Sequence, residues 1–398
     1  MHILYLVPHV PNPTKIRSHF QVRGLLDAGH RVTVVTLNRS EVDAKNITKL
    51  EQSGAKVISV KLSKYQSLWN AVKTLPTRLP LQSRFMWSSE LMGKIQAVLK
   101  NDPPDMIHVE HLRMACYGLQ FIKDWPTVWD AVDYLSALYQ QAGHFSVNWI
   151  TRQVYRVEGK RLEAYERWLS NQFPATLVIS TKDQALFQEN HPQSSQIHYQ
   201  PQGLPISSQD ATIERDSKTL AITGTLNYHP NVASVHYFVR DILPLVQRQM
   251  SDIRLQLVGA NPDESIQALT NDTIKITGFV PSITDYLHRS TIALAPVTYG
   301  SGIQIKVLEA FLTATPLVAT STALRGLDVR HEREVLIADT PTDFANAVLR
   351  LLNDPALRKQ IGEAGRKYVE QNHDLRATTA HLVGIYQQVI DNSSRTKF

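Results

Sequence analysis

Residues 295–321 read APVTYGSGIQIKVLEAFLTATPLVATS, and this stretch decides the fold of the 398-residue chain. It is typical of a buried strand end, a glycine-containing loop, an amphipathic helix and a second buried strand. Gly300 and Gly302 allow a tight turn and leave backbone N–H groups uncovered by side chains. A helix that starts near Ile303 would aim its free amides and positive dipole end over that loop. The stretch therefore predicts a seat for an anion of phosphate size.

Two charged residues follow on the predicted helix. Lys306 adds a full positive charge one turn in, and Glu309 lies one turn further along the same face. A carboxylate there can accept a hydrogen bond from a ribose or sugar hydroxyl. In an ordinary α/β corner the same two residues would form a solvent-exposed pair, and an isolated Gly-x-Gly loop does not distinguish the two interpretations.

The rest of the chain alternates between apolar runs and helical segments. Such continuous apolar runs are typical of parallel strands that are buried on both faces. Strands are predicted at 3–7, 32–37, 57–60, 106–109, 127–129, 177–179, 220–222, 255–258, 274–276, 292–295 and 317–318. Helices are predicted at 18–28 and 147–171, the latter with apolar positions at Val154, Val157, Leu162, Tyr165 and Leu169. Residues 200–217 carry prolines, a glycine and polar residues without periodicity, which is typical of a linker.

Two successive arrays of this kind predict an α/β protein of two Rossmann-like domains, whose parallel sheets face each other across a cleft. The length of the chain also favours two domains over one. The predicted boundaries are 1–203 for the first domain, 204–217 for the linker, 218–374 for the second domain and 375–398 for a C-terminal helix.

The composition is that of a soluble globular protein, with 43% hydrophobic and 20% charged residues. Cys116 is the only cysteine in the sequence, so no internal disulfide can form, and a reducing compartment is expected. No run of about 18 apolar residues predicts a membrane-spanning helix. The first residues do not resemble a signal peptide, and we expect a cytoplasmic location.

Charge is unevenly distributed along the chain. Residues 1–205 hold 23 Lys and Arg against 16 Asp and Glu, whereas the remainder holds 19 against 20. The basic first half suggests contact with an anionic membrane surface or an acidic acceptor, with an ordinary solvated surface as the alternative. Its basic residues are spread out without interleaved aromatic side chains, so nucleic acid is not an expected partner.

Ligands of open parallel sheets bind beyond the carboxyl ends of the strands. Four loops in the second half carry glycine at such an end: Gly224-Thr225, the loop at Gly259, the loop at Gly278 and the Gly300 to Gly302 loop. One glycine after a strand is common in any α/β fold. Four at one sheet edge indicate a nucleotide site.

The first half offers polar residues at comparable positions. Arg17 follows the first strand at the start of a helix, where its side chain could reach into the cleft. The alternative interpretation is an ordinary surface arginine. Asp130 and Asp133 follow a strand end, where a carboxylate can orient an acceptor hydroxyl or act in acid–base catalysis. The alternative for Asp130 is a helix N-cap.

A metal site is not predicted from the histidines of the first half. His108 and His111 flank Glu110, which suggests zinc ligands at first sight. They straddle a strand end rather than share one helix face, and no third ligand for Asp130 and Asp133 is evident.

Segments along nearly the whole chain resemble one family. They are MHILYLVPHVPNP, GHRVTVVTL, VWDAVDYLS, YRVEGKRLEAYERWL, ATLVIS, QPQGLP, AITGTLNYHPNVAS, LQLVGANP, ITGFVPSITDYL, GSGIQIKVLEA and HDLRATTAHLVGIY. In this order and spacing the chain resembles the retaining glycosyltransferases of the GT4-type family, which have the GT-B fold. It is most similar in appearance to the sugar transferases of bacterial exopolysaccharide systems.

The resemblance implies transfer of a sugar from a nucleotide-diphosphate sugar to an acceptor hydroxyl, with retention and without a metal or other cofactor. It implies catalytic roles for Lys306, Asp130 and Arg17. The predicted donor-binding residues are Gly224, Thr225, Gly259, Gly278, Phe279, Val280, Gly300, Ser301, Gly302, Ile303, Gln304, Lys306 and Glu309. A carbohydrate or lipid-linked acceptor, polysaccharide or glycoconjugate biosynthesis, and a C-terminal helix that crosses back to the first domain are implied in the same way.

Within this resemblance the predicted roles are specific. Gly278, Phe279 and Val280 would lie near the base, and Glu309 would bind the ribose. The amides of residues 302–304 would hold the distal phosphate, and Lys306 would stabilise the leaving group.

The chain also departs from the family pattern. Ser301 stands where the family often has the first of two glutamates, and the loop at residues 224–227 lacks a frequent basic residue. Asp130 stands where a histidine is frequent, and residues 11–15 lack paired glycines. A nucleotide-sugar epimerase of the same fold and a catalytically idle sugar-binding scaffold therefore remain as alternatives.

Overall fold

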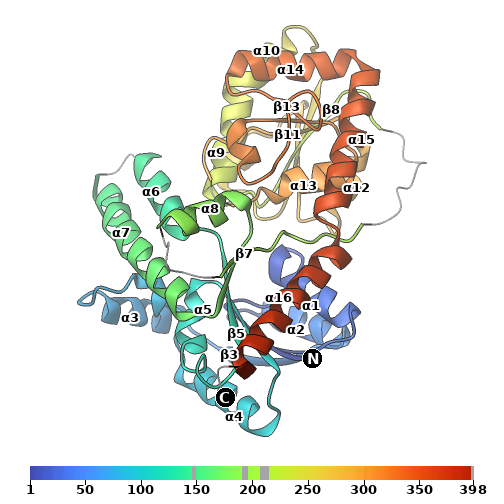
Figure 1. Cartoon of the computed structure of the whole chain (residues 1–398). Coiled ribbons are helices and arrows are strands. Elements are labelled where there is room, and N and C mark those ends of the chain that lie inside the picture. The colour runs from blue at the N-terminus through green and yellow to red at the C-terminus, as the bar shows by residue number, and fades with distance from the viewer. Residues whose placement is uncertain (146–148, 191–195, 207–214, 301, 396–398) are drawn as a thin grey trace. The chain divides into compact units, whose positions relative to one another are not determined.

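The computed structural model describes residues 1–145, 149–190, 196–206, 215–300 and 302–395 (Figure 1). The chain forms two compact units, one of Met1–Pro205 with Asp374–Phe398 and the other of Ile206–His373. Each unit contains one parallel sheet with helices packed on it. The prediction of two Rossmann-like α/β domains is therefore confirmed.

The sheet of the first unit has the strand order β3-β2-β1-β4-β5-β6-β7, and every neighbouring pair is parallel. Its strands are β1 (His2–Val7), β2 (Arg31–Asn38), β3 (Lys56–Lys61), β4 (Met106–Glu110), β5 (Thr127–Val132), β6 (Ala175–Val178) and β7 (Ile197–Tyr199). The order reverses between β1 and β4, because β2 and β3 extend the sheet to one side and β4 to β7 to the other.

Helices of the first unit cover both faces of this sheet. They are α1 (Ile16–Asp27), α2 (Glu41–Gln52), α3 (Lys64–Thr74), η1 (Leu81–Ser83), α4 (Ser89–Asn101), α5 (Leu112–Gly118), α6 (Leu135–Phe145), α7 (Trp149–Gln172), α8 (Thr181–Asn190) and α16 (Leu375–Arg395). The C-terminal helix α16 runs beside α1 (Figure 1) and places Leu382, Ile385 and Tyr386 in the same apolar cluster as Ile3 and Tyr5. A second cluster fills the opposite face of the sheet.

The sheet of the second unit has the order β10-β9-β8-β11-β12-β13, again with parallel neighbours. Its strands are β8 (Thr219–Thr223), β9 (Arg254–Val258), β10 (Ile274–Gly278), β11 (Ile292–Ala295), β12 (Leu317–Ala319) and β13 (Leu336–Ile337). Its helices are α9 (His229–Tyr237), η2 (Phe238–Ile242), α10 (Leu243–Gln247), α11 (Glu264–Gln267), α12 (Ile283–Arg289), α13 (Ile305–Leu312), η3 (Ser321–Leu324), α14 (Pro341–Asn353) and α15 (Pro355–Asn372). Here the order reverses between β8 and β11.

Some local predictions need correction. Helix α13 begins at Ile305 rather than near Ile303, because Gly302 has a positive φ of 66° and Gln304 is extended. Strand β5 continues to Val132, so Asp130 lies within the strand rather than after it. Strands β7 and β13 lie outside the predicted strands.

The linker and the helices lie outside the two sheets. The predicted linker at 204–217 lies partly outside the described residues, which omit 207–214. Of the helices in the part of the chain that the structure describes, none is both long enough and apolar enough to cross a bilayer.

Candidate functional site

Each unit contains one point where the strand order reverses, between β1 and β4 in the first unit and between β8 and β11 in the second. Such switch points are where open parallel sheets bind ligands. In the second unit the loops after β8 and β11 meet at this point, and in the first unit the loops after β1 and β4 do. Most of the predicted site residues lie at or beside these two places.

Helix α13 is joined to the start of α9 through one hydrogen bond. The Nζ atom of Lys306 donates to Oδ1 of Asn231 at 2.6 Å, and Nδ2 of Asn231 donates to the carbonyl of Thr225 at 2.9 Å. Asn231 thereby connects the helix after β11 to the loop after β8. Its amide carries no charge, so it orients the ammonium group without neutralising it.

The electrostatics of Lys306 and Glu309 reflect burial. Both side chains are only partly accessible to solvent, so the alternative of a solvent-exposed pair is wrong. Burial lowers the pKa of Lys306 to about 8, although the charge of Glu309 opposes that shift. Burial raises the pKa of Glu309 to about 7, and the charge of Lys306 opposes it. Lys306 is therefore mainly charged at neutral pH, and no ion pair within 4.0 Å joins the two among the described residues.

The loop between β11 and α13 turns at one of its two glycines among the described residues. Gly302 adopts a positive φ, and a Cβ atom at Gly300 would lie 3.2 Å from Nε2 of Gln304. Gln304 is the N-cap residue of α13, and its side chain makes no capping hydrogen bond. Ile303 is buried at the base of the loop. Ser301 lies outside the described residues, so its predicted role stays a prediction.

Gly224 and Gly259 are required by close backbone packing. A Cβ atom on Gly259 would lie 1.8 Å from the carbonyl oxygen of Gly224, and one on Gly224 would lie 2.8 Å from Nδ2 of Asn231. Gly224 also has a φ of 139°, which L side chains rarely adopt. These glycines hold the loops after β8 and β9 together and thereby position Asn231 against Lys306.

The loop after β10 is open. Gly278 has a φ of 69° and nothing within 4 Å of its would-be Cβ, and the Phe279 ring beside it is 72% exposed. Val280 follows with partial exposure. An exposed aromatic ring next to an unobstructed backbone offers a surface on which a planar base can stack.

Sequence reasoning missed a second link at this switch point. His229, the first residue of α9, hydrogen-bonds through Nδ1 to the hydroxyl of Tyr299 in the loop after β11. Together with the Lys306–Asn231 bond, it joins the two loops at two positions. Neither Asn231 nor His229 carried a local signal, because both act through partners about 70 residues away.

In the first unit, Arg17 and Asp130 form a buried ion pair. The guanidinium donates to the carboxylate through Nε at 2.8 Å and Nη2 at 3.0 Å, and it also donates to the carbonyl of Gln200. Arg17 is 7% exposed and Asp130 is fully buried. The alternatives of a surface arginine and a helix N-cap are therefore wrong. Both charged groups are instead engaged with each other.

A chain of hydrogen bonds leads from this pair to Glu110. Nε2 of Gln21 donates to Asp130, and the Tyr5 hydroxyl lies 2.5 Å from Oε1 of Gln21 and 2.6 Å from Oε2 of Glu110. One hydroxyl proton cannot serve two acceptor oxygens, so a protonated Glu110 must supply the second. Burial, with the nearby charge of Asp130, raises the pKa of Glu110 to about 7 and favours that neutral form.

The histidines around this cluster are neutral and turn to different partners. His108 receives or donates a hydrogen bond at Nδ1 with the Tyr386 hydroxyl of α16, and burial lowers its pKa to about 4. His111 accepts from the backbone N–H of Arg113, and burial lowers its pKa to about 3. Among the described residues no group of three or more His, Cys, Asp or Glu side chains is arranged to hold a metal ion.

Asp133 follows the end of β5 and is not part of this ion pair. Burial, together with the charge of Asp183, raises its pKa to about 7. A carboxyl group with such a pKa is suited to proton transfer near neutral pH.

Two family models match the chain in succession. Residues 17–203 match the family described as "Glycosyl transferase 4-like domain", and residues 217–354 match "Glycosyl transferases group 1". Each match lies within one of the two units, and the second match contains both strands that flank the switch point of its unit.

Known proteins share the fold at low sequence identity. The sucrose-phosphate synthase of Thermosynechococcus elongatus is 15% identical with a TM-score of 0.73, covering 98% of this chain and 99% of that one. Alr3699/HepE of Anabaena, solved in complex with UDP and glucose, is 14% identical with a TM-score of 0.66, covering 98% of this chain and all of that one.

Curated relatives match over shorter stretches. Glycosyltransferase 1 domain-containing protein 1 of Xenopus tropicalis is 27% identical over 85 residues, which are 21% of this chain. The chain spans only 25% to 41% of the length of the curated relatives it matches.

Proposed function

We propose that this chain, a glycosyltransferase with the GT-B fold, transfers a sugar from a nucleotide-diphosphate sugar to an acceptor hydroxyl with retention, as GT4-type enzymes do. The observation that carries the proposal is the hydrogen bond between Lys306 and Asn231. It holds a partly buried ammonium group, without a neutralising partner within 4.0 Å among the described residues, at the switch point of the second unit.

The donor would bind in the second unit through three sets of contacts. Lys306 and the amides of residues 302–304 would hold the diphosphate and stabilise the charge that develops on it as the glycosidic bond breaks. Glu309 would accept from the ribose hydroxyls, and the loop at Gly278 would hold the base beside Phe279. The UDP and glucose named with the similar Anabaena protein support a donor of this class.

The acceptor would be positioned by the first unit. The buried Arg17–Asp130 pair makes the loop after β1 rigid, because it ties the first turn of α1 to β5. Asp130 and Arg17 would thus act by positioning neighbouring groups. Asp133, which lies at the end of β5 with its raised pKa, is the carboxyl group more available for proton transfer.

Three broader features are part of the same proposal. The acceptor would be a carbohydrate or lipid-linked sugar in polysaccharide or glycoconjugate biosynthesis. The reaction would need no metal, because Lys306 and the helix amides would supply the positive charge that a cation supplies elsewhere. The protein would act in the cytoplasm.

A thermal-shift screen tests the donor site first. The purified chain is heated with UDP, GDP, dTDP, ADP or CMP, each with magnesium and with EDTA. A nucleotide at about 100 times its Kd adds about 2.7 kcal/mol to the stability of the folded state. We expect one nucleoside diphosphate to raise Tm by a few degrees, equally with EDTA, and to have no such effect on Lys306→Ala.

The reaction type is then decided by products. Incubation with the matching nucleotide sugar and candidate acceptors should release nucleoside diphosphate, and NMR should show the donor's anomeric configuration in the product. An altered nucleotide sugar without released diphosphate would instead establish the epimerase. The absence of any Tm shift with every nucleotide would contradict the proposal and favour the sugar-binding scaffold.

A further inference from the structure

Helix α3 is oriented with its apolar side away from the protein. Its buried residues are Ser67 and Thr74, both polar. Tyr65, Leu68 and Trp69 lie on its solvent side, where Tyr65 is 85% and Trp69 59% exposed. Burial of apolar surface ordinarily orients an amphipathic helix the opposite way. The packing within this unit therefore does not explain the apolar residues of α3.

The exposed residues of α3 form one stripe. Tyr65, Leu68, Trp69 and Val72 are spaced by three, one and three positions, which places them on a single helix face. All four are exposed, and so is Leu75 directly after the helix. A contiguous exposed patch of this kind on a soluble unit marks an interaction surface.

Helix α7 also carries exposed apolar residues. Trp149 is 71% exposed, and Val154 and Val157 are also exposed, although the sequence pattern grouped the two valines with the buried Leu162. Figure 1 draws α3 and α7 on the same flank of this unit, and the backbone N–H of Leu81, shortly after α3, donates to Glu158 of α7.

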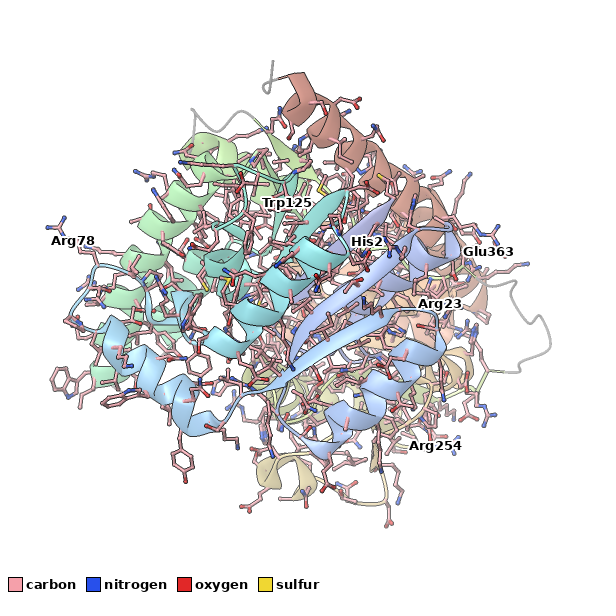
Figure 2. All side chains as sticks on the ribbon, turned by 90° about the horizontal axis from the view of Figure 1, so that it is seen from below. His2, Arg23, Arg78, Trp125, Arg254 and Glu363 are labelled. Carbon is pink, nitrogen blue, oxygen red and sulfur yellow. The ribbon has the colours of Figure 1, made fainter. Side chains whose placement is uncertain are left out.

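Positive charge surrounds the stripe. Residues 52–89 contain no Asp or Glu, and Lys61, Lys64, Lys73 and Arg78 in this region are exposed. Lys73 lies over the Trp69 ring at 5.6 Å, and Arg78 projects outward from this flank (Figure 2). Basic Arg156 and Lys160 are exposed on α7, whereas Glu158 is buried.

We propose that the α3–α7 surface, formed by Tyr65, Leu68, Trp69, Val72, Trp149, Val154 and Val157 with their basic neighbours, docks on an anionic lipid bilayer. Tryptophan and tyrosine rings partition into the headgroup region, with the apolar stripe just below it. The lysines and arginines are attracted to anionic headgroups. The inference identifies which surface of the basic first half contacts a membrane, and it does not depend on sugar transfer.

Charge argues for a lipid partner over a second copy of this chain. In a two-fold dimer built through this surface, the same basic residues would face each other and repel. An anionic bilayer supplies both the apolar interior and the opposite charge.

Vesicle sedimentation without nucleotide or acceptor tests the proposal. The full chain is mixed with phosphatidylcholine vesicles, alone or with about one third phosphatidylglycerol. We expect binding to the anionic vesicles only, together with a blue shift of tryptophan fluorescence. Trp69→Glu and Leu68→Glu should each weaken binding about tenfold or more, and Lys64→Gln about fivefold.

Val42→Glu is the matched control, because Val42 is a valine on α2 of the same unit and is 66% exposed, compared with 59% for Trp69. We expect it to bind vesicles like the unmodified chain, and all four variants to keep the Tm. Equal binding by Trp69→Glu would overturn the proposal. So would concentration-dependent dimerisation in the absence of lipid that Trp69→Glu abolishes, because the surface would then bind a second copy.

Discussion

The Nζ atom of Lys306 lies 2.6 Å from Oδ1 of Asn231 and bridges α13 to the start of α9. Seventy-five residues separate the two in sequence, and each follows one of the strands that flank the switch point. A neutral amide orients the lysine, so the charge remains available to an anion at the mouth of the loop. This orientation of Lys306 by Asn231 supports the proposal that the lysine stabilises the leaving diphosphate.

Replacing Lys306 tests that role directly. Lys306→Ala should lower kcat about 100-fold or more, because loss of an electrostatic contact to developing charge costs several kcal/mol of transition-state stabilisation. Steady-state kinetics measure the effect, with Lys367→Ala as a control for loss of an exposed lysine in the same unit. A change in kcat within about twofold would exclude the role.

The neutrality of Asn231 leads to a second expectation. Asn231→Asp keeps the shape but places a carboxylate beside Lys306, which competes with the diphosphate for the ammonium group. Nucleotide affinity should fall about tenfold or more while the Tm of the free protein is maintained or rises. Calorimetric titration with the nucleotide found in the thermal screen measures the affinity, and thermal unfolding without nucleotide measures the Tm. Unchanged affinity would show that the diphosphate does not contact Lys306.

Glu309 provides a test of the ribose contact. Glu309→Gln should weaken nucleotide binding about fivefold to tenfold, because a charged acceptor forms stronger hydrogen bonds to hydroxyls than an amide does. The 2′-deoxy form of the nucleotide lacks one ribose hydroxyl, so it should bind Glu309→Gln and the unmodified chain with equal affinity. Glu363→Gln, at an exposed position on α15, is the control. Equal binding by Glu309→Gln and the unmodified chain would remove Glu309 from the site.

The buried pair of Arg17 and Asp130 should be primarily structural. Asp130→Asn leaves the Arg17 charge buried without its counter-ion, and breaking such a pair typically costs about 3–5 kcal/mol. Urea unfolding of the first unit should shift accordingly, and Arg17→Met with Asp130→Leu should recover part of the loss. If the urea midpoint were unchanged while acceptor turnover fell, Asp130 would act on the substrate itself.

Glu110 predicts a pH dependence of stability. Its pKa of about 7 in the folded state exceeds the ordinary value of 4.5, so the folded protein binds the proton more tightly than the unfolded chain. Stability from this group is fully present below about pH 4.5 and is lost as pH rises through 7. Glu110→Gln should remove that loss. Between pH 5 and pH 8, the unfolding free energy of the unmodified chain should therefore fall by up to about 3 kcal/mol more than that of Glu110→Gln.

Urea unfolding at both pH values measures this difference. Glu90→Gln, an exposed glutamate on α4, should show no comparable change between the two pH values. An identical pH dependence in Glu110→Gln and the unmodified chain would mean that Glu110 is already ionised in the folded protein.

The site residues that can be predicted from the sequence are those that lie close together along the chain. Gly300, Gly302, Lys306 and Glu309 stand within ten residues of one another, so a short loop and one helix turn bring them together. Gly224 and Gly259 are predictable from the sequence only as glycines in loops that follow strands. Their packing against each other depends on the pairing of β8 with β9.

The sequence alone determined the two α/β arrays, because buried parallel strands need continuous apolar runs and glycine is needed where the backbone turns tightly after them. Tertiary structure alone decided the partners of the polar groups. Asn231 meets Lys306, and Tyr5 meets Gln21 and Glu110, only because a parallel sheet brings distant loops to one edge. It likewise decided that α3 exposes its apolar stripe, since periodicity defines a helix face but not the direction in which that face points.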